Sequence, residues 1–210
     1  MRDDDRGILP CALCTAVTDA TRRDDPFLYN SKLLETAHFV VIPSLGPFVV
    51  GHVMAVSKFH CESLASMGAD ALREYDELAN RLRSLSFLRE SDLLEAEHGS
   101  TKCEKAGACV VHTHVHLLPG MGVFFDVFKE HLEPRPERCL LELAKPVPPY
   151  IFARAGCKQA LFAARGLASQ TIRRVLCDAL DRDDTDWMQA PRLDWVKETV
   201  ELWHKHRSEL

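Results

Sequence analysis

Long apolar runs, an excess of basic residues and internal repeats are all missing from this sequence of 210 residues. No stretch approaches the roughly 20 apolar residues that a membrane-spanning helix requires, which argues against a membrane protein. The formal net charge of −5 offers no general attraction to nucleic acid. With 46% hydrophobic and 27% charged residues, the chain has the composition of an ordinary soluble globular protein.

A secretory signal and a disulfide framework are also missing. The first five residues are acidic overall and contain no apolar run, so we expect no export signal. Cysteine occurs eight times, but without the dense, regular spacing of a disulfide scaffold. Only Cys11 and Cys14 are spaced as metal ligands are. We therefore expect a cytoplasmic protein.

Three histidines alternate with apolar or β-branched residues between positions 109 and 119. This period-two pattern predicts a strand that presents His112, His114 and His116 on one face. Same-face neighbours on a strand lie about 6.5 Å apart, whereas a zinc–nitrogen bond is about 2 Å long. One metal therefore cannot bind all three. At least one imidazole has another role, in catalysis or as a hydrogen-bonded side chain in a polar groove.

The hydrophobic periodicity predicts an α+β domain with an antiparallel sheet and one long helix. The long helix is expected from about 66 to 89, where apolar residues recur at helical spacing. The strands are expected at 39–42, 49–56, 93–96 and along the histidine segment.

A proline-rich stretch over 133–149 predicts an extended connection between two parts of the chain. We divide the chain at this stretch into a catalytic domain, 1–145, and an extension packed on it, 146–210. The extension is expected to begin with a β-hairpin whose strands are 150–154 and 159–163. A helix capped by Ser169 is expected over 170–181, and a last helix with Pro191 in its first turn over 191–206.

The start of the helix near 170 allows two interpretations. Ser169-Gln170 with Arg173 and Arg174 could bind phosphate at a helix N-terminus. Alternatively the arginines could form the solvated face of a packing helix, and we favour the solvated face. Trp187 and the two later tryptophans are expected to be core or interface anchors.

The residues of the histidine strand, His112-Thr113-His114-Val115-His116-Leu117-Leu118, resemble the signature of the histidine-triad family. Gly51-His52 resembles the upstream strand of the family, which supplies a fourth active-site histidine. Cys11-x-x-Cys14 and His60 resemble the zinc-binding branch. The resemblance covers roughly residues 8–145 and implies a histidine-triad-like antiparallel sheet.

The resemblance implies a nucleotidyl hydrolase or transferase that acts on nucleotide conjugates such as dinucleoside polyphosphates. His114 would form a covalent nucleotidyl-histidine, and His116 and His52 would contact phosphate oxygens. The alternatives are a phosphorylase or transferase with an acceptor other than water, and a nucleotide-binding adaptor with little turnover. A homodimer is also considered.

The family pattern also implies further binding and metal residues. The candidate substrate-binding residues are Asn30, Gly107, Cys109 and His116. Cys11, Cys14, His60 and His112 would form a structural zinc site. The alternative for the two cysteines is a pair of free thiols.

Two positions depart from the family pattern. Gly107-Ala108-Cys109 stands where many members have Gly-Gln-Ser or Gly-Gln-Thr, so the hydroxyl is lost and the thiol is a poor donor. Glu97 stands where an asparagine is common, and a carboxylate near phosphate would repel it. His98 is expected at the surface.

Overall fold

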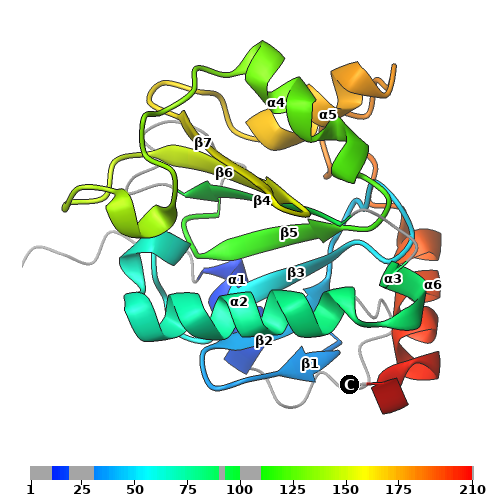
Figure 1. Cartoon of the computed structure of the whole chain (residues 1–210). Helices are drawn as coiled ribbons and strands as arrows, with labels where there is room; N and C mark the ends of the chain where they lie inside the picture. Colours follow the sequence, from blue (N-terminus) through cyan, green and yellow to red (C-terminus); the bar gives the residue numbers. More distant parts are fainter. Residues whose placement is uncertain (1–10, 19–30, 90–92, 100–109, 210) are drawn as a thin grey trace, which may run out of the picture.

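The computed structural model describes residues 11–18, 31–89, 93–99 and 110–209. These residues form a seven-stranded sheet with the strand order β1-β2-β3-β5-β4-β6-β7 and with every neighbouring pair antiparallel (Figure 1). The predicted α+β class with an antiparallel sheet is confirmed. Within the described ranges, no helix has the length and apolar character that crossing a bilayer requires.

The strands and helices alternate irregularly along the chain. The strands are β1 Leu34–Glu35, β2 Phe39–Pro43, β3 Val53–Ser57, β4 Leu94–Gly99, β5 His114–Leu118, β6 Tyr150–Ala155 and β7 Lys158–Ala163. The helices are α1 Ala12–Thr18, α2 Ala69–Arg83, α3 Ser86–Arg89, α4 Phe125–His131, α5 Thr171–Ala179 and α6 Leu193–Lys205.

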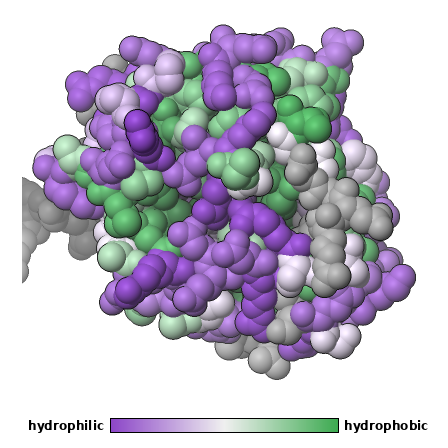
Figure 2. All heavy atoms as spheres, in the orientation of Figure 1, coloured by the Kyte–Doolittle hydropathy of each residue, from purple (hydrophilic) through white to green (hydrophobic). Residues whose placement is uncertain are grey.

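Helix α2 is shorter than the predicted helix over 66–89. It starts after Gly68, and it ends because Ser84 and Leu85 donate to carbonyls three residues back, which tightens the last turn. Leu85 is nevertheless fully buried, so it continues the apolar spacing beyond the helix end. The outward side of α2 is largely hydrophilic in Figure 2, as an amphipathic helix requires.

Strand β3 begins later than the predicted strand over 49–56. The amide of His52 donates to the Val49 carbonyl, which closes a turn, and Gly51 adopts a positive φ of 90° within it. This turn delivers His52 to the first position before the strand, beside the histidine strand β5.

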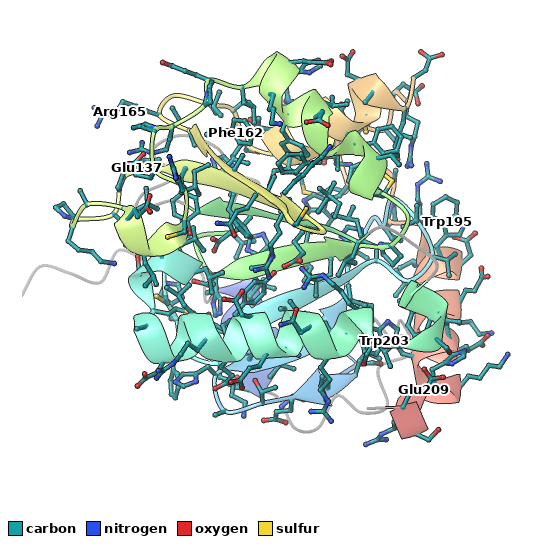
Figure 3. All side chains as sticks on the ribbon, in the orientation of Figure 1. Glu137, Phe162, Arg165, Trp195, Trp203 and Glu209 are labelled. Atoms are coloured by element: carbon teal, nitrogen blue, oxygen red, sulfur yellow. The ribbon has the colours of Figure 1, made fainter. Side chains whose placement is uncertain are left out.

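The sheet has different coverings on its two faces. Helix α2 packs on one face, and Trp203 reaches from α6 into the same apolar cluster (Figure 3). The other face carries two separate clusters, one under α4 and α5 and one under α1. The α1 cluster lies on β2 and β3, while the α5 cluster lies mainly on β4 and β6. Strand β5 runs between them in the strand order.

The segment after residue 146 continues the same sheet. Strand β6 pairs with β4 from Leu94↔Ala155 to Gly99↔Tyr150, and β7 pairs with β6. The predicted hairpin is therefore present, and Gly156 and Cys157 connect its two strands.

Both predicted helix starts in this segment are wrong. The N-cap of α5 is Gln170 in a left-handed conformation rather than Ser169, and no side chain caps the helix. Helix α6 follows Arg192, so Pro191 lies outside its first turn. In both places a left-handed residue turns the chain sharply into the helix, a conformation that local sequence patterns do not signal for Gln or Arg.

Candidate active site

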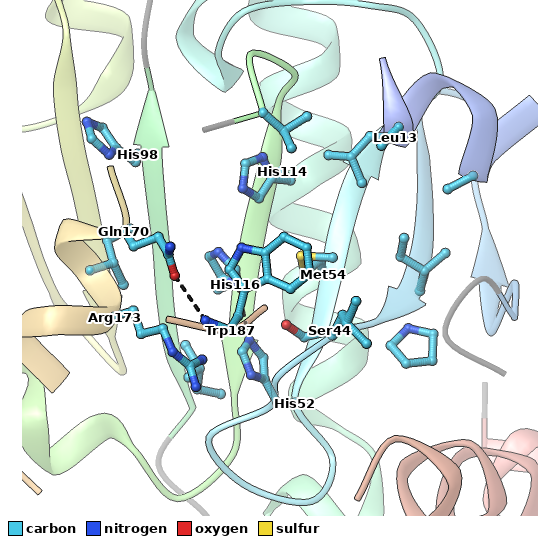
Figure 4. A pocket seen from close by; sticks show the side chains of 18 of the residues that line it. Leu13, Ser44, His52, Met54, His98, His114, His116, Gln170, Arg173 and Trp187 are labelled. Carbon is cyan, nitrogen blue, oxygen red and sulfur yellow. Dashed lines mark hydrogen bonds between the residues drawn. The ribbon is translucent and has the colours of Figure 1, made fainter. Parts of the chain in front are cut away.

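A pocket of about 410 Å³ lies over β3 and β5, between the cluster under α1 and the cluster under α5 (Figure 4). His52, His98, His114 and His116 all line it. The period-two alternation of β5 explains this placement, because His114 and His116 face the pocket while Val115 and Leu117 pack into the core on the α2 side.

The ring orientation of His114 is fixed by its own strand. Its Nδ1 lies 2.6 Å from the carbonyl oxygen of His112, so Nδ1 carries the proton and donates. Nε2 is then the unprotonated nitrogen. Burial lowers the pKa of His114 below 6.5, partly opposed by this hydrogen bond. The ring is thus a neutral imidazole with a lone pair at Nε2 near pH 7.

His52 and His116 form a directed hydrogen-bond chain. The backbone amide of Phe48 donates to His52 Nδ1 at 3.3 Å, so His52 carries its proton on Nε2. That Nε2–H donates to His116 Nδ1 at 3.1 Å. His116 therefore carries its own proton on Nε2. Burial, reinforced by the positive charge of Arg173, lowers the pKa of His52 to about 3.

Cys11, Cys14, His60 and His112 form a cluster whose ligand atoms all lie within 4.8 Å of one another. Cys11 Sγ and Cys14 Sγ each lie 3.4 Å from His112 Nδ1, and Cys14 Sγ lies 3.3 Å from His60 Nδ1. A tetrahedral zinc with ordinary bond lengths holds sulfur and nitrogen roughly 3.5 Å apart. The four side chains therefore fit a zinc ion.

The surroundings of this cluster orient its ligands. His112 Nε2 donates to the Ser57 carbonyl at 2.8 Å, which leaves Nδ1 for the metal. Thr113 ties the loop that carries His60 to the segment before β5, because its amide and hydroxyl both donate to the Cys61 carbonyl. His112 lies in a bend of this segment, so the prediction of one strand that carries all three histidines is wrong for His112. The Cys61 thiol itself points to the Ser63 carbonyl, away from the cluster.

The expectations for Glu97 and His98 are both wrong, for one reason. Strand β4 turns Glu97 to the α2 side of the sheet, where it is buried and accepts hydrogen bonds from the Leu64 amide and the Tyr150 hydroxyl. Burial raises the pKa of Glu97 to about 7. The next residue, His98, therefore faces the pocket. The carboxylate lies on the opposite face from the histidines and does not line the pocket.

The C-terminal segment contributes pocket residues that we expected to be solvated or in the core. Gln170, Arg173 and Trp187 line the pocket, whereas Arg174 is exposed. Arg173 is 6% exposed, so the predicted solvated face is wrong for this residue. A sequence signal existed: Arg173 lies three and four residues before Leu176 and Cys177, which places it on the buried face of α5.

Three candidate substrate-binding residues, Asn30, Gly107 and Cys109, lie outside the described residues. Their proposed roles stay predictions. Among the other candidate residues, the structure brings His52, His114 and His116 together at the pocket and gathers the two cysteines with His60 and His112 beside it.

Neither a scan against protein-family models nor a search of the curated proteins finds a match for this sequence. Solved structures of histidine-triad proteins do match. A HIT family hydrolase from Clostridium thermocellum is 24% identical, over 54% of this chain and 93% of that one, with a TM-score of 0.38. A Zn-bound histidine triad family protein from Mycobacterium smegmatis is 22% identical, over 54% of this chain and 76% of that one, with a TM-score of 0.39. A hypothetical histidine triad nucleotide-binding protein from Sulfolobus tokodaii is 24% identical, over 52% and 68%, with a TM-score of 0.39. The chain is similar to these proteins, and identities and TM-scores of this size assign it no activity.

Proposed function

We propose that this protein is a histidine-triad nucleotidyl hydrolase or transferase that acts on nucleotide conjugates through a covalent nucleotidyl-His114. The observation that carries the proposal is the 2.6 Å hydrogen bond from His114 Nδ1 to the His112 carbonyl, which leaves Nε2 as the nucleophilic nitrogen in a ring that lines the pocket. A neutral imidazole is a nucleophile at pH 7 and needs no separate base.

In the first step, the Nε2 lone pair of His114 attacks the α-phosphorus. The phosphorus–nitrogen bond forms while the bond from phosphorus to the leaving group breaks, and the leaving group departs with the electron pair. The Nε2–H of His116 donates to a phosphoryl oxygen, because its Nδ1 already accepts from His52. Such fixed donors stabilise the charge that develops in the transition state.

In the second step, the oxygen of water or of another acceptor forms a bond to the same phosphorus and releases its proton to solvent. The phosphorus–nitrogen bond breaks and its electron pair returns to His114 Nε2, which restores the starting tautomer. The Nδ1–H stays bonded to the His112 carbonyl throughout, so the ring does not need to reorient between the two steps.

Cys11, Cys14, His60 and His112 would hold a zinc ion with a structural role. Through these residues a bound ion would join α1 and the loop after β3 to the segment just before β5. His112 supplies the carbonyl that orients His114, so fixing the His112 ring also steadies the nucleophile.

The test is covalent labelling. Diadenosine triphosphate with label on an α-phosphorus is mixed with the zinc-loaded protein, the reaction is quenched under alkaline conditions, and label on intact protein is measured. We expect label on wild type and on the control His204→Ala, an exposed histidine outside the pocket, and none on His114→Ala.

Each other outcome has a defined meaning. Label that persists on His114→Ala refutes the nucleophile. Absence of both label and turnover across a panel of nucleotide conjugates favours a binding protein. Label that added inorganic phosphate removes faster than water does identifies a phosphorylase.

A further inference from the structure

The pocket has two ends of different chemistry, one on each side of the histidines. Toward α1 most of the lining side chains are apolar, such as Leu13 and Met54, with Thr15 and Glu62 beside them. Toward α5 the pocket is lined by Gln170 and Arg173, together with Thr171 and the apolar Ile172. In Figure 4, His114 and His116 of β5 lie between these two groups. A bound nucleotide conjugate has an apolar base and a charged part, and each matches one end.

Arg173 supplies the positive charge at the polar end. Three of its five N–H groups are used, by the Gly46 carbonyl and by the carbonyl and carboxylate of Asp184. The other two N–H groups have no hydrogen-bond partner among the residues that the structure describes, so they can donate to a ligand. Because Arg182 and Arg192 also contact the Asp184 carboxylate, that single negative charge is shared by three arginines.

Gln170 and Trp187 form the rest of this end. The Gln170 carboxamide accepts from the Trp187 amide at 3.2 Å and donates to Asp186 at 3.2 Å. These two bonds hold the segment around Trp187 against the start of α5. The side chains of Gln170 and Trp187 both line the pocket there. Besides histidines, the described lining residues that carry full charge are Arg173 and Glu62, and Glu62 lies in the loop that also carries His60.

Phosphoryl transfer places the nucleophile and the leaving group roughly in line. With the base at the apolar end, the leaving group departs from His114 toward α5. We propose that Gln170, Arg173 and Trp187 form a leaving-group subsite that selects anionic, phosphate-bearing leaving groups over uncharged ones. This inference rests on the proposed function and deepens it, because it names the residues that would distinguish one class of leaving group from another. Gln170 and Arg173 are then specificity-determining residues.

The test compares two substrates that share adenosine monophosphate and differ in the leaving group. Diadenosine triphosphate releases ADP, whereas a tryptamine phosphoramidate of adenosine monophosphate releases an amine. Gln170→Glu adds a negative charge at nearly constant shape. We expect it to lower kcat/KM for diadenosine triphosphate about tenfold or more, since like charges in contact are costly, and to change the phosphoramidate value less than about twofold.

Gln189→Glu is the matched control, because Gln189 also donates to Asp186 but does not line the pocket. It should change neither value, and melting curves check that both variants fold. Titration of diadenosine triphosphate into His114→Ala, with and without Gln170→Glu, reads the subsite without turnover and should show the same tenfold loss. An equal effect of Gln170→Glu on both substrates, or no loss of binding, overturns the subsite. Absence of any turnover by wild type overturns the proposed function instead, while the titration still decides the subsite.

Discussion

At the scale of single residues, the role of each histidine depends on which of its ring nitrogens is already bonded. His114 donates from Nδ1 to a carbonyl and has a lone pair at Nε2, whereas His116 accepts at Nδ1 and carries its proton on Nε2. His112 donates from Nε2 to the Ser57 carbonyl, so its Nδ1 is available to a metal. Three histidines in and just before β5 therefore offer different atoms: a lone pair at His114 Nε2, an N–H at His116 Nε2 and an available Nδ1 at His112.

The buried His52 makes a prediction about stability and pH. Its pKa is about 3 in the fold, against about 6.5 in an unfolded chain, so the unfolded state binds more protons as the pH falls below 6.5. The stability from this residue is complete above pH 6.5 and is lost as the pH falls toward 3. Between pH 7.5 and 5.5 we expect wild type to lose about 1 kcal/mol more unfolding free energy than His52→Gln.

Urea unfolding at the two pH values measures this difference. His204→Gln replaces an exposed histidine and should follow wild type. If His52→Gln loses as much stability on acidification as wild type does, the buried neutral His52 is not the cause.

At the scale of elements, we predict that α1 depends on zinc held by the cluster of cysteines and histidines. A helix of seven residues is too short to be stable alone, and α1 buries only Leu13, Ala16 and Val17. We expect wild type to bind one zinc ion per chain and Cys14→Ser to bind none. The variant should also have a lower melting temperature, because without the metal the cluster no longer fixes α1 to the sheet.

Zinc content by mass spectrometry and thermal melting check this prediction. Cys61→Ser is the matched control, since its thiol points to Ser63 rather than to the cluster. Full zinc content in Cys14→Ser, or equal loss in both variants, would contradict the assigned ligands.

The loop after β2 requires a glycine at position 46. Gly46 has φ +66°, and a Cβ added there would lie 2.7 Å from the Cβ of Trp187. Gly46→Ala should therefore cost the strain of a left-handed alanine, about 1–2 kcal/mol, plus about 1–3 kcal/mol of overpacking against Trp187. It should also weaken nucleotide binding, since Trp187 lines the pocket.

Gly166→Ala separates the two costs. Gly166 has φ +78°, and an added Cβ would meet nothing within 4 Å. Urea unfolding should give the strain alone for Gly166→Ala and a clearly larger loss for Gly46→Ala. Equal losses would show that the Trp187 contact does not limit this position.

At the scale of the whole molecule, the described strands form one continuous sheet, so we expect the chain to unfold as one cooperative unit. Strand β6 pairs with β4 in the middle of the sheet, and Tyr150 and Phe152 belong to the same core cluster as Tyr75 of α2. The three tryptophans all lie between 187 and 203, so their fluorescence reports the C-terminal segment and, through Trp203, its packing against the α2 cluster.

We expect urea unfolding followed by tryptophan fluorescence and by far-ultraviolet circular dichroism to give coincident transitions. The fluorescence reports the C-terminal segment, whereas the circular dichroism reports the whole sheet and all the helices. A fluorescence transition that precedes the other would mean that the C-terminal segment unfolds as a separate unit.

Part of the site could be predicted from the sequence because its signals are local. Alternation alone placed His114 and His116 on one face of a strand. The resemblance to the histidine-triad family pointed to His52 and to the set Cys11, Cys14, His60 and His112. The predicted faces of Glu97 and His98 were wrong, because a shift of one residue along a strand moves a side chain to the opposite face of the sheet. No local sequence pattern sets that register.

The sequence by itself determined the α+β class, the antiparallel strands and the chemistry of the histidine strand, since these depend on periodicities of two and 3.6 residues. Only the tertiary structure decided that α5 and Trp187 complete the pocket, and that Arg173 is buried beside the histidines. The reason is physical: the pairing of β6 with β4 joins residues more than fifty positions apart, and this long-range pairing determines which helix lies over which face.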